Sequence, residues 1–305
     1  MSRTADPLAE RLDGMPTWRV LGLAAGCVGA SLLTIVLLLV VARMTAPMSP
    51  LPPRLHEAVV GLAVVLLCYE VGRRFLLRAP AAWFLAGRPD RTVLPWVAFG
   101  FALPTVVIGV QLWLLGATRV GQLPALDVDV RYIIDSVGMG LLSGVLEELA
   151  FRGALLRLLE ARWGPAWAIG GSAVVFAALH QGHADRPGPL VLVLGTMLAA
   201  GLLLGVVVVR TRSVWSAVAV HLGWNAVVGG QLVAVAAPGA TVLPAVVQFQ
   251  LARTSLLLTG GEATLAATPM TMALLLLAAA GVARLRPAHA FGGRPIDPVA
   301  GDEPR

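Results

Sequence analysis

The chain has 305 residues, of which 57% are hydrophobic and 13% charged, with a net charge of +6 and a mean hydropathy of +0.81. Soluble domains are about 45–50% apolar and about 25% charged, so this composition excludes an ordinary soluble protein. It also excludes disordered, collagen-like and coiled-coil chains, because the apolar content is high and neither a glycine repeat nor sustained heptads occur. A polytopic membrane protein remains.

Long apolar runs separated by arginine clusters predict the membrane spans. A helix needs about 20 apolar residues to cross a bilayer core of roughly 30 Å. Eight segments are expected as helices, namely 20–42, 55–72, 92–118, 132–155, 165–179, 187–209, 213–238 and 263–283. The predicted fold is therefore an all-α, polytopic transmembrane helix bundle of about eight spans.

The arginines also predict the orientation in the membrane. All 23 basic residues are arginine. Most of them lie in the N-terminal segment and in every second segment after it, which are on the same side of the membrane. Short cytoplasmic segments carry the excess of Lys and Arg, so we expect a multi-pass protein of the cell membrane with both termini in the cytoplasm. The arginines form no single basic domain, and no nucleic-acid partner is expected.

Four regions follow from this pattern. We expect a cytoplasmic N-terminal tail at 1–17, three helices within 18–130, a core with the final helix at 131–286, and a cytoplasmic tail at 287–305. Both tails are polar and are expected to be mobile. Cys27 and Cys68 lie inside predicted spans, where neither a disulfide framework nor a zinc knuckle is expected.

Ionisable groups within spans are candidates for function, because each costs about 2.5–3.5 kcal/mol at the centre of an inserted helix. Glu70 and Asp135 are interpreted as packing or interfacial groups, and His56, His183 and His289 as solvated. The remaining candidates, with one buried amide, are Glu147, Glu148, Arg152, His180, His221 and Asn225.

The segment around Glu147 is the densest in charge. Glu148 and Arg152 are four residues apart with the acid first, which favours an ion pair that stabilises the helix. Glu147 lies about 140° around the helix from Arg152 and has no partner there. Such a carboxylate suits a general base or a metal ligand.

Helix geometry predicts that three helices bring the polar groups together. Gly164 is a plausible turn, with Glu147 17 residues before it and His180 16 after it, so an antiparallel hairpin places both at nearly one depth. His221 and Asn225 are four apart on one helix face, near the middle of their span. We therefore expect an acid, two imidazoles and an amide to meet.

These residues resemble the CPBP intramembrane proteases, the family that includes type II CAAX prenyl endopeptidases and abortive-infection proteins. The resemblance covers about 135–230 and consists of three motifs in order: Glu147-Glu148-x-x-x-Arg152, Phe176-x-x-x-His180 and His221-x-x-x-Asn225.

The resemblance implies hydrolysis of peptide bonds in membrane-embedded or lipid-anchored substrates. Glu147 would then deprotonate a water that His180 holds, Glu148 and Arg152 would brace the helix, and His221 with Asn225 would bind the oxyanion. Glu147, His180 and His221 could instead supply three ligands to one divalent metal such as zinc, which would make the enzyme a metalloprotease. Both alternatives stay open on the residues alone.

A second functional class is a non-catalytic membrane scaffold, immunity factor or proton-coupled carrier that uses the same polar cluster. The arginine-rich, lysine-free composition is typical of a GC-rich bacterial genome. Nothing in the sequence indicates a pocket for a prenyl group.

Overall fold

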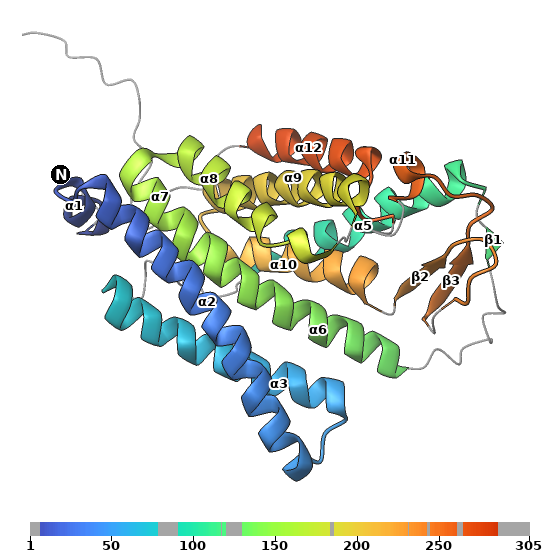
Figure 1. Ribbon diagram of the computed structural model, residues 1–305, viewed down its shortest axis with the longest axis horizontal. Helices are drawn as coiled ribbons and strands as arrows, with labels where there is room; N and C mark the ends of the chain where they lie inside the picture. The colour runs from blue at the N-terminus through green and yellow to red at the C-terminus, as the bar shows by residue number, and fades with distance from the viewer. Residues whose placement is uncertain are drawn as a thin grey trace, which may run out of the picture.

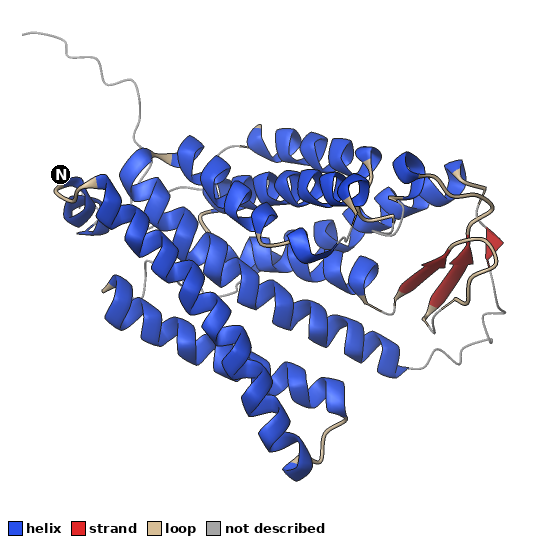
Figure 2. Ribbon diagram, in the orientation of Figure 1, coloured by secondary structure: helices blue, strands red, loops and turns tan. Residues whose placement is uncertain are grey.

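The computed structural model describes residues 7–78, 91–116, 118–119, 130–183, 186–230, 232–242, 245–260 and 265–285. Helices make up most of them, and one small sheet lies at the end of the molecule opposite α1 (Figures 1 and 2). The predicted helical membrane bundle is confirmed.

The main helices are α1 (Pro7–Asp13), α2 (Thr17–Thr45), α3 (Pro53–Val71), α5 (Leu94–Leu114), α6 (Val130–Glu148), α7 (Leu156–Trp163), α8 (Pro165–Ala178), α9 (Pro187–Thr211), α10 (Val214–Trp224), α11 (Leu256–Thr259) and α12 (Pro269–Ala283). Short 3-10 turns are η1 (Ala46–Met48), η3 (Arg91–Val93) and η5 (Gln181–His183), and π-helical segments are η2 (Gly72–Leu77), η4 (Leu149–Leu155) and η6 (Asn225–Gly229).

Each of the eight expected apolar segments contains a helix. Four helical stretches of the described chain are long and apolar enough to cross a membrane, namely Thr17–Met48, Pro53–Leu77, Leu94–Leu114 and Pro187–Thr211. Three others are apolar but shorter, Pro165–Ala178, Val214–Gly229 and Pro269–Ala283. The number of spans, eight, stays a prediction.

The expectation of one helix over 213–238 is wrong at its end. The helix stops at Gly229, and Val233–Ala236 forms β2. Two successive glycines, Gly229 and Gly230, weaken the helix there, and the valines that follow favour a strand. The sheet has the order β1-β3-β2, with β1 (Thr118–Arg119) antiparallel and β2 parallel to β3 (Val247–Gln250).

The expected mobile N-terminal tail also contains a helix. Residues 7–13 form α1, which packs against α7. Leu12 is fully buried in the main hydrophobic cluster, and Arg11 Nη1 donates to Leu77 O at 2.8 Å. The polar composition of this segment gave no indication that Leu12 would be buried in the core. The C-terminal tail lies outside the described residues.

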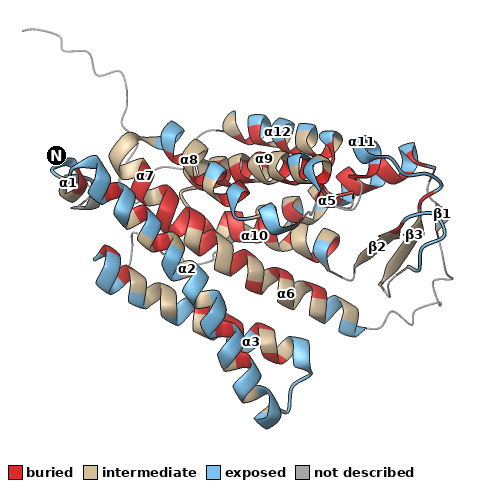
Figure 3. Ribbon diagram, viewed as in Figure 1, coloured by how far each residue is buried: buried red, intermediate tan, exposed pale blue. Residues whose placement is uncertain are grey.

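The helices form a hairpin stack around one buried region. The α7–α8 and α8–α9 pairs pack together, α12 lies on α9, and α10 lies between α5 and α6. Buried residues gather where these helices meet, whereas α2 and α3 carry many exposed ones (Figure 3). In its most apolar window α2 is 17% buried and α9 56%. The apolar side chains that α2 exposes are those expected to face lipid.

The backbones of α5 and α10 approach closely at a pair of glycines. A Cβ added at Gly223 would lie 2.3 Å from the carbonyl carbon of Gly100, and one at Gly100 would lie 2.5 Å from Ala219 O. The neighbours are backbone atoms, which cannot rotate away. This crossing fixes the position of α10, on which two of the candidate site residues lie.

We therefore expect Gly223→Ala to lower the free energy of unfolding by about 1–3 kcal/mol, because overpacking forces the two helices apart. Thermal unfolding of the detergent-purified protein measures this. Gly29→Ala on α2 is the matched control, since a Cβ there meets nothing within 4 Å and should leave stability unchanged or slightly raised. Equal midpoints for both variants would contradict the close crossing.

Candidate active site

A fully buried ion pair lies where α6 passes into η4. Arg152 Nη1 donates to Glu148 Oε1 at 2.8 Å, and neither side chain is accessible to solvent. Arg152 Nη2 also donates to the carbonyl of Gly201 on α9 at 3.3 Å, and its guanidinium lies 4.6 Å from the ring centre of Phe176 on α8. The predicted pair is confirmed, and it ties three helices together.

The same carboxylate orients His221 on α10. Nδ1 of His221 lies 2.8 Å from Glu148 Oε1. An ionised carboxylate can only accept a hydrogen bond, so Nδ1 carries a proton. In the neutral ring, Nε2 then presents its lone pair on the opposite side.

His180 follows the end of α8 and has the same tautomer. Its Nδ1 lies 2.7 Å from the carbonyl oxygen of Phe176, which can only accept. The ring also packs on the Phe176 side chain, with 4.5 Å between ring centres. These two contacts fix the ring, and Nε2 lies 3.8 Å from Glu147 Oε2.

Glu147 lies between the two imidazoles. Its Oε2 is 3.8 Å from Nε2 of His180 and 3.8 Å from Nε2 of His221, and it has no hydrogen-bond partner among the described residues. These separations are too long for direct hydrogen bonds. One water molecule between them could donate to Glu147 Oε2 and to one of the two Nε2 atoms. The predicted meeting of the α6–α8 hairpin with α10 is confirmed.

Asn225 is held by a residue that the sequence reasoning missed. Its Nδ2 donates to Ser143 Oγ on α6 at 2.8 Å, and Ser143 Oγ donates in turn to Met139 O at 3.0 Å. Ser143 precedes Glu147 by one helical turn, a spacing that could have indicated it. One N–H of the Asn225 amide remains for another partner.

Two of the π-helical segments begin beside these side chains. The segment η4 follows Glu148 directly and contains Arg152, and η6 begins at Asn225. Such segments are rare and are frequent at functional sites, because the wider turn shifts side chains relative to a regular helix.

The site residues line a cavity of about 440 Å³ between α8, α9, α10 and α12. Glu147, His180, His221 and Asn225 supply one polar wall, and most other lining residues are apolar. Glu147 and His180 also line a second cavity of about 170 Å³, whose far side is α2 at Val28 and Leu32. The pair therefore borders two cavities.

The donor set of Glu147, His180 and His221 matches catalytic zinc sites in chemistry, with two imidazole lone pairs and a carboxylate. The spacing of the three side chains, however, does not match that of such a zinc site. In the part of the chain that the structure describes, no three His, Cys, Asp or Glu side chains are grouped closely enough to hold a metal ion.

The other ionisable candidates lie away from this cavity. Glu70 pairs with Arg73 on its own helix, and Asp135 lines a separate cavity of about 420 Å³. The expectation that His56 is solvated is wrong. Its side chain is buried where α3 meets α2, and its Nε2 lies 3.1 Å from Thr45 Oγ1. The His183 side chain and His289 lie outside the described residues.

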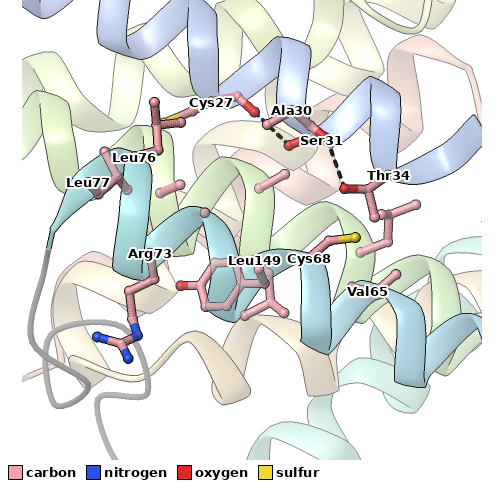
Figure 4. Close-up of a pocket in the computed structure, with 15 residues that line it drawn as sticks. Cys27, Ala30, Ser31, Thr34, Val65, Cys68, Arg73, Leu76, Leu77 and Leu149 are labelled. Carbon is pink, nitrogen blue, oxygen red and sulfur yellow. Dashed lines mark hydrogen bonds between the residues drawn. The ribbon is translucent and has the colours of Figure 1, made fainter. Parts of the chain in front are cut away.

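The two cysteines line a small apolar pocket between α2, α3 and the α6–η4 junction (Figure 4). Both Cys27 and Cys68 are free, as expected for thiols within spans.

A comparison with protein families confirms the resemblance. Residues 129–227 match the family described as type II CAAX prenyl endopeptidase Rce1-like. The matched segment begins just before α6 and ends within η6, so it contains all six residues of the three motifs. No curated protein and no solved structure matches the chain. The match supports a protease of CAAX type, a membrane setting and a membrane-associated substrate.

The buried pair generates a stability prediction. Arg152→Met should lower the free energy of unfolding by about 3–5 kcal/mol, because it leaves the Glu148 carboxylate buried without its cation. Thermal unfolding in detergent measures the loss, and adding Glu148→Gln should restore part of it.

Arg73→Met is the control, because the partner Glu70 is 46% exposed and can be solvated when the pair is lost. If Arg73→Met lowered the free energy of unfolding as much as Arg152→Met does, burial would not be what makes the Glu148–Arg152 pair important for stability.

Proposed function

We propose that the chain is an intramembrane endopeptidase in which Glu147 and His180 activate a water molecule for attack on a peptide bond. The observation that carries this proposal is the position of Glu147 Oε2, 3.8 Å from both imidazole Nε2 atoms and facing the 440 Å³ cavity. The Rce1-like match over this region supports it.

In the proposed reaction, the water donates one hydrogen bond to Glu147 Oε2 and one to Nε2 of His180. Glu147 removes a proton as the water oxygen bonds to the substrate carbonyl carbon, which becomes tetrahedral. The carbon–nitrogen bond then breaks, and Glu147 returns the proton to the leaving nitrogen. A positioned carboxylate of this kind contributes about 10²–10⁴-fold to the rate.

His221 and Asn225 are the proposed donors to the oxyanion. The amide of Asn225 keeps one N–H beyond the one that Ser143 accepts. Nε2 of His221 can donate only from the imidazolium form, which suits a ring with Glu148 at Nδ1 and Glu147 near Nε2. Each such donor contributes about 2.7–4 kcal/mol to the transition state.

The cavity also indicates the class of substrate. Apolar side chains of α9 and α12, such as Val193, Met197 and Leu275, also line it. An apolar cavity inside a membrane bundle favours an apolar peptide segment that is embedded in the bilayer or anchored to it by a lipid. We propose such a segment as the substrate.

Glu147→Gln should abolish cleavage, with a fall in kcat of about 10²–10⁴-fold, while the thermal midpoint stays near that of the wild type. A fluorogenic library of prenylated and acylated peptides in detergent micelles measures the activity. The matched control is Glu70→Gln, which removes an equal charge from a partly exposed ion pair on α3 and should retain full activity.

If the wild type cleaves no member of the library and the Glu147→Gln variant binds as the wild type does, the protease proposal fails. Proton flux in proteoliposomes then tests the carrier alternative, in which His221→Ala should stop flux without any peptide present.

The purified wild type is expected to cleave peptides after exhaustive EDTA treatment and to hold far less than one zinc per chain, as measured by elemental analysis. The reason is that the proposed base acts directly on water. Stoichiometric zinc that is lost in Glu147→Ala, His180→Ala and His221→Ala alike would contradict this and assign all three as ligands.

A further inference from the structure

Thr196, in the middle of α9, does not make the hydrogen bond that other helical hydroxyls of this chain make. A Ser or Thr side chain inside a helix normally donates to the carbonyl four residues earlier. Figure 4 shows two such bonds on α2. The described helices contain this bond from Ser31 to Cys27, Thr34 to Ala30, Thr45 to Val41, Thr105 to Phe101, Ser143 to Met139 and Thr211 to Val207.

The hydroxyl of Thr196 is buried without a partner. The residue is 1% exposed, and its Oγ1 has no hydrogen-bond partner among the residues that the structure describes. An unpaired buried hydroxyl costs about as much as a lost hydrogen bond, so a water molecule or a bound ligand would be needed to satisfy it.

The residue lies in the wall of the active-site cavity. The α9 residues that line this cavity are spaced by three and four along one helix face, and Thr196 is the polar one among Val193, Thr196, Met197, Ala200, Leu203 and Leu204. Glu147 and the two histidines line the same cavity.

The packing of α8 against α9 places Thr196 at the level of the Glu147–His180 pair. A Cβ at Gly201 would meet Ala173, and one at Gly205 would meet Ile169, so the two helices are antiparallel in this register. Continued along α9, the register brings Thr196 level with about Ala178, two residues before His180.

We propose that Thr196 Oγ1 hydrogen-bonds the backbone of the substrate peptide next to the bond that is cleaved. This inference rests on the proposed function and extends it with a peptide-binding group on α9, in the cavity that the base also lines. It adds to the site a residue that none of the three motifs contains.

The chemistry of the substrate explains the need for such a group. A peptide bond within a helix is shielded, so attack requires an extended segment whose carbonyl and N–H groups have lost their helical partners. In an apolar cavity these groups find no water, and each costs several kcal/mol unless the protein pairs it. A hydroxyl can serve either group, because it both donates and accepts.

Thr196→Val removes the hydroxyl and keeps the shape of the side chain. Because the hydroxyl has no partner among the described residues, its removal should raise the thermal midpoint by about 2–4 °C. The same change should lower kcat/KM by about 5- to 10-fold, since one hydrogen bond to the substrate is lost. Thr196→Ser keeps the hydroxyl and should retain most of the activity.

Thr211→Val is the matched control on the same helix. Its hydroxyl is already bonded to Val207 O, so its loss should lower the thermal midpoint and leave kcat/KM unchanged. If Thr196 had only a structural role, Thr196→Val would likewise lower the thermal midpoint and leave kcat/KM unchanged. A raised thermal midpoint together with a lowered kcat/KM for Thr196→Val is therefore specific to a hydroxyl that hydrogen-bonds the substrate and not the protein.

A binding measurement separates this inference from the proposed function. Photo-crosslinking and fluorescence anisotropy with the prenylated peptide library measure Kd on the Glu147→Gln variant, which binds without turnover. Adding Thr196→Val should raise Kd about 5- to 10-fold, and adding Thr196→Ser should not. Equal Kd values for the Val and Thr forms, or no binding of any peptide, would overturn the inference, whereas absent cleavage with intact binding would overturn the protease alone.

Discussion

One carboxylate oxygen, Glu148 Oε1, holds the site together. It accepts from Arg152 on the same helical run and from His221 on α10, both at 2.8 Å. Through Arg152 the same cluster reaches the backbone of α9 at Gly201. Burying these charges has a large desolvation cost, which several good hydrogen bonds must offset. The hydrogen bond from His221 Nδ1 to Glu148 Oε1 sets the tautomer and the orientation of the His221 ring.

The cavity beside this cluster has two unlike walls. Glu147, His180 and His221 line it from the α6–α8 hairpin and α10, while α9 and α12 contribute apolar side chains and, on α9, the hydroxyl of Thr196. Low polarity on one side strengthens the electrostatic effect of the groups on the other, since little water screens them. A peptide in this cavity would contact aliphatic side chains, the Thr196 hydroxyl and the proposed reactive groups.

Residue spacing sufficed for the parts of the site that depend on one helix or one hairpin. The ion pair of Glu148 with Arg152, the turn at Gly164 and the common depth of Glu147 and His180 all follow from counting residues along regular helices. The burial of His56 depends on a contact between α2 and α3 that spacing does not encode. The β2 strand was missed because short apolar runs suit a helix or a strand equally well. Ser143 and Thr196 were missed because hydroxyls carry no charge and stand out only when their partners, or the lack of them, are known.

The smaller cavity that Glu147 and His180 line is also lined by α2. Of the four candidate spans in the described chain, this helix has the smallest buried share. Most of its surface therefore faces the surrounding medium and not the bundle, and a helix with few interior contacts moves at low free-energy cost. Bilayer thickness and lateral pressure act directly on such a helix. The lipid composition of the membrane thus becomes part of the environment of the proposed catalytic base.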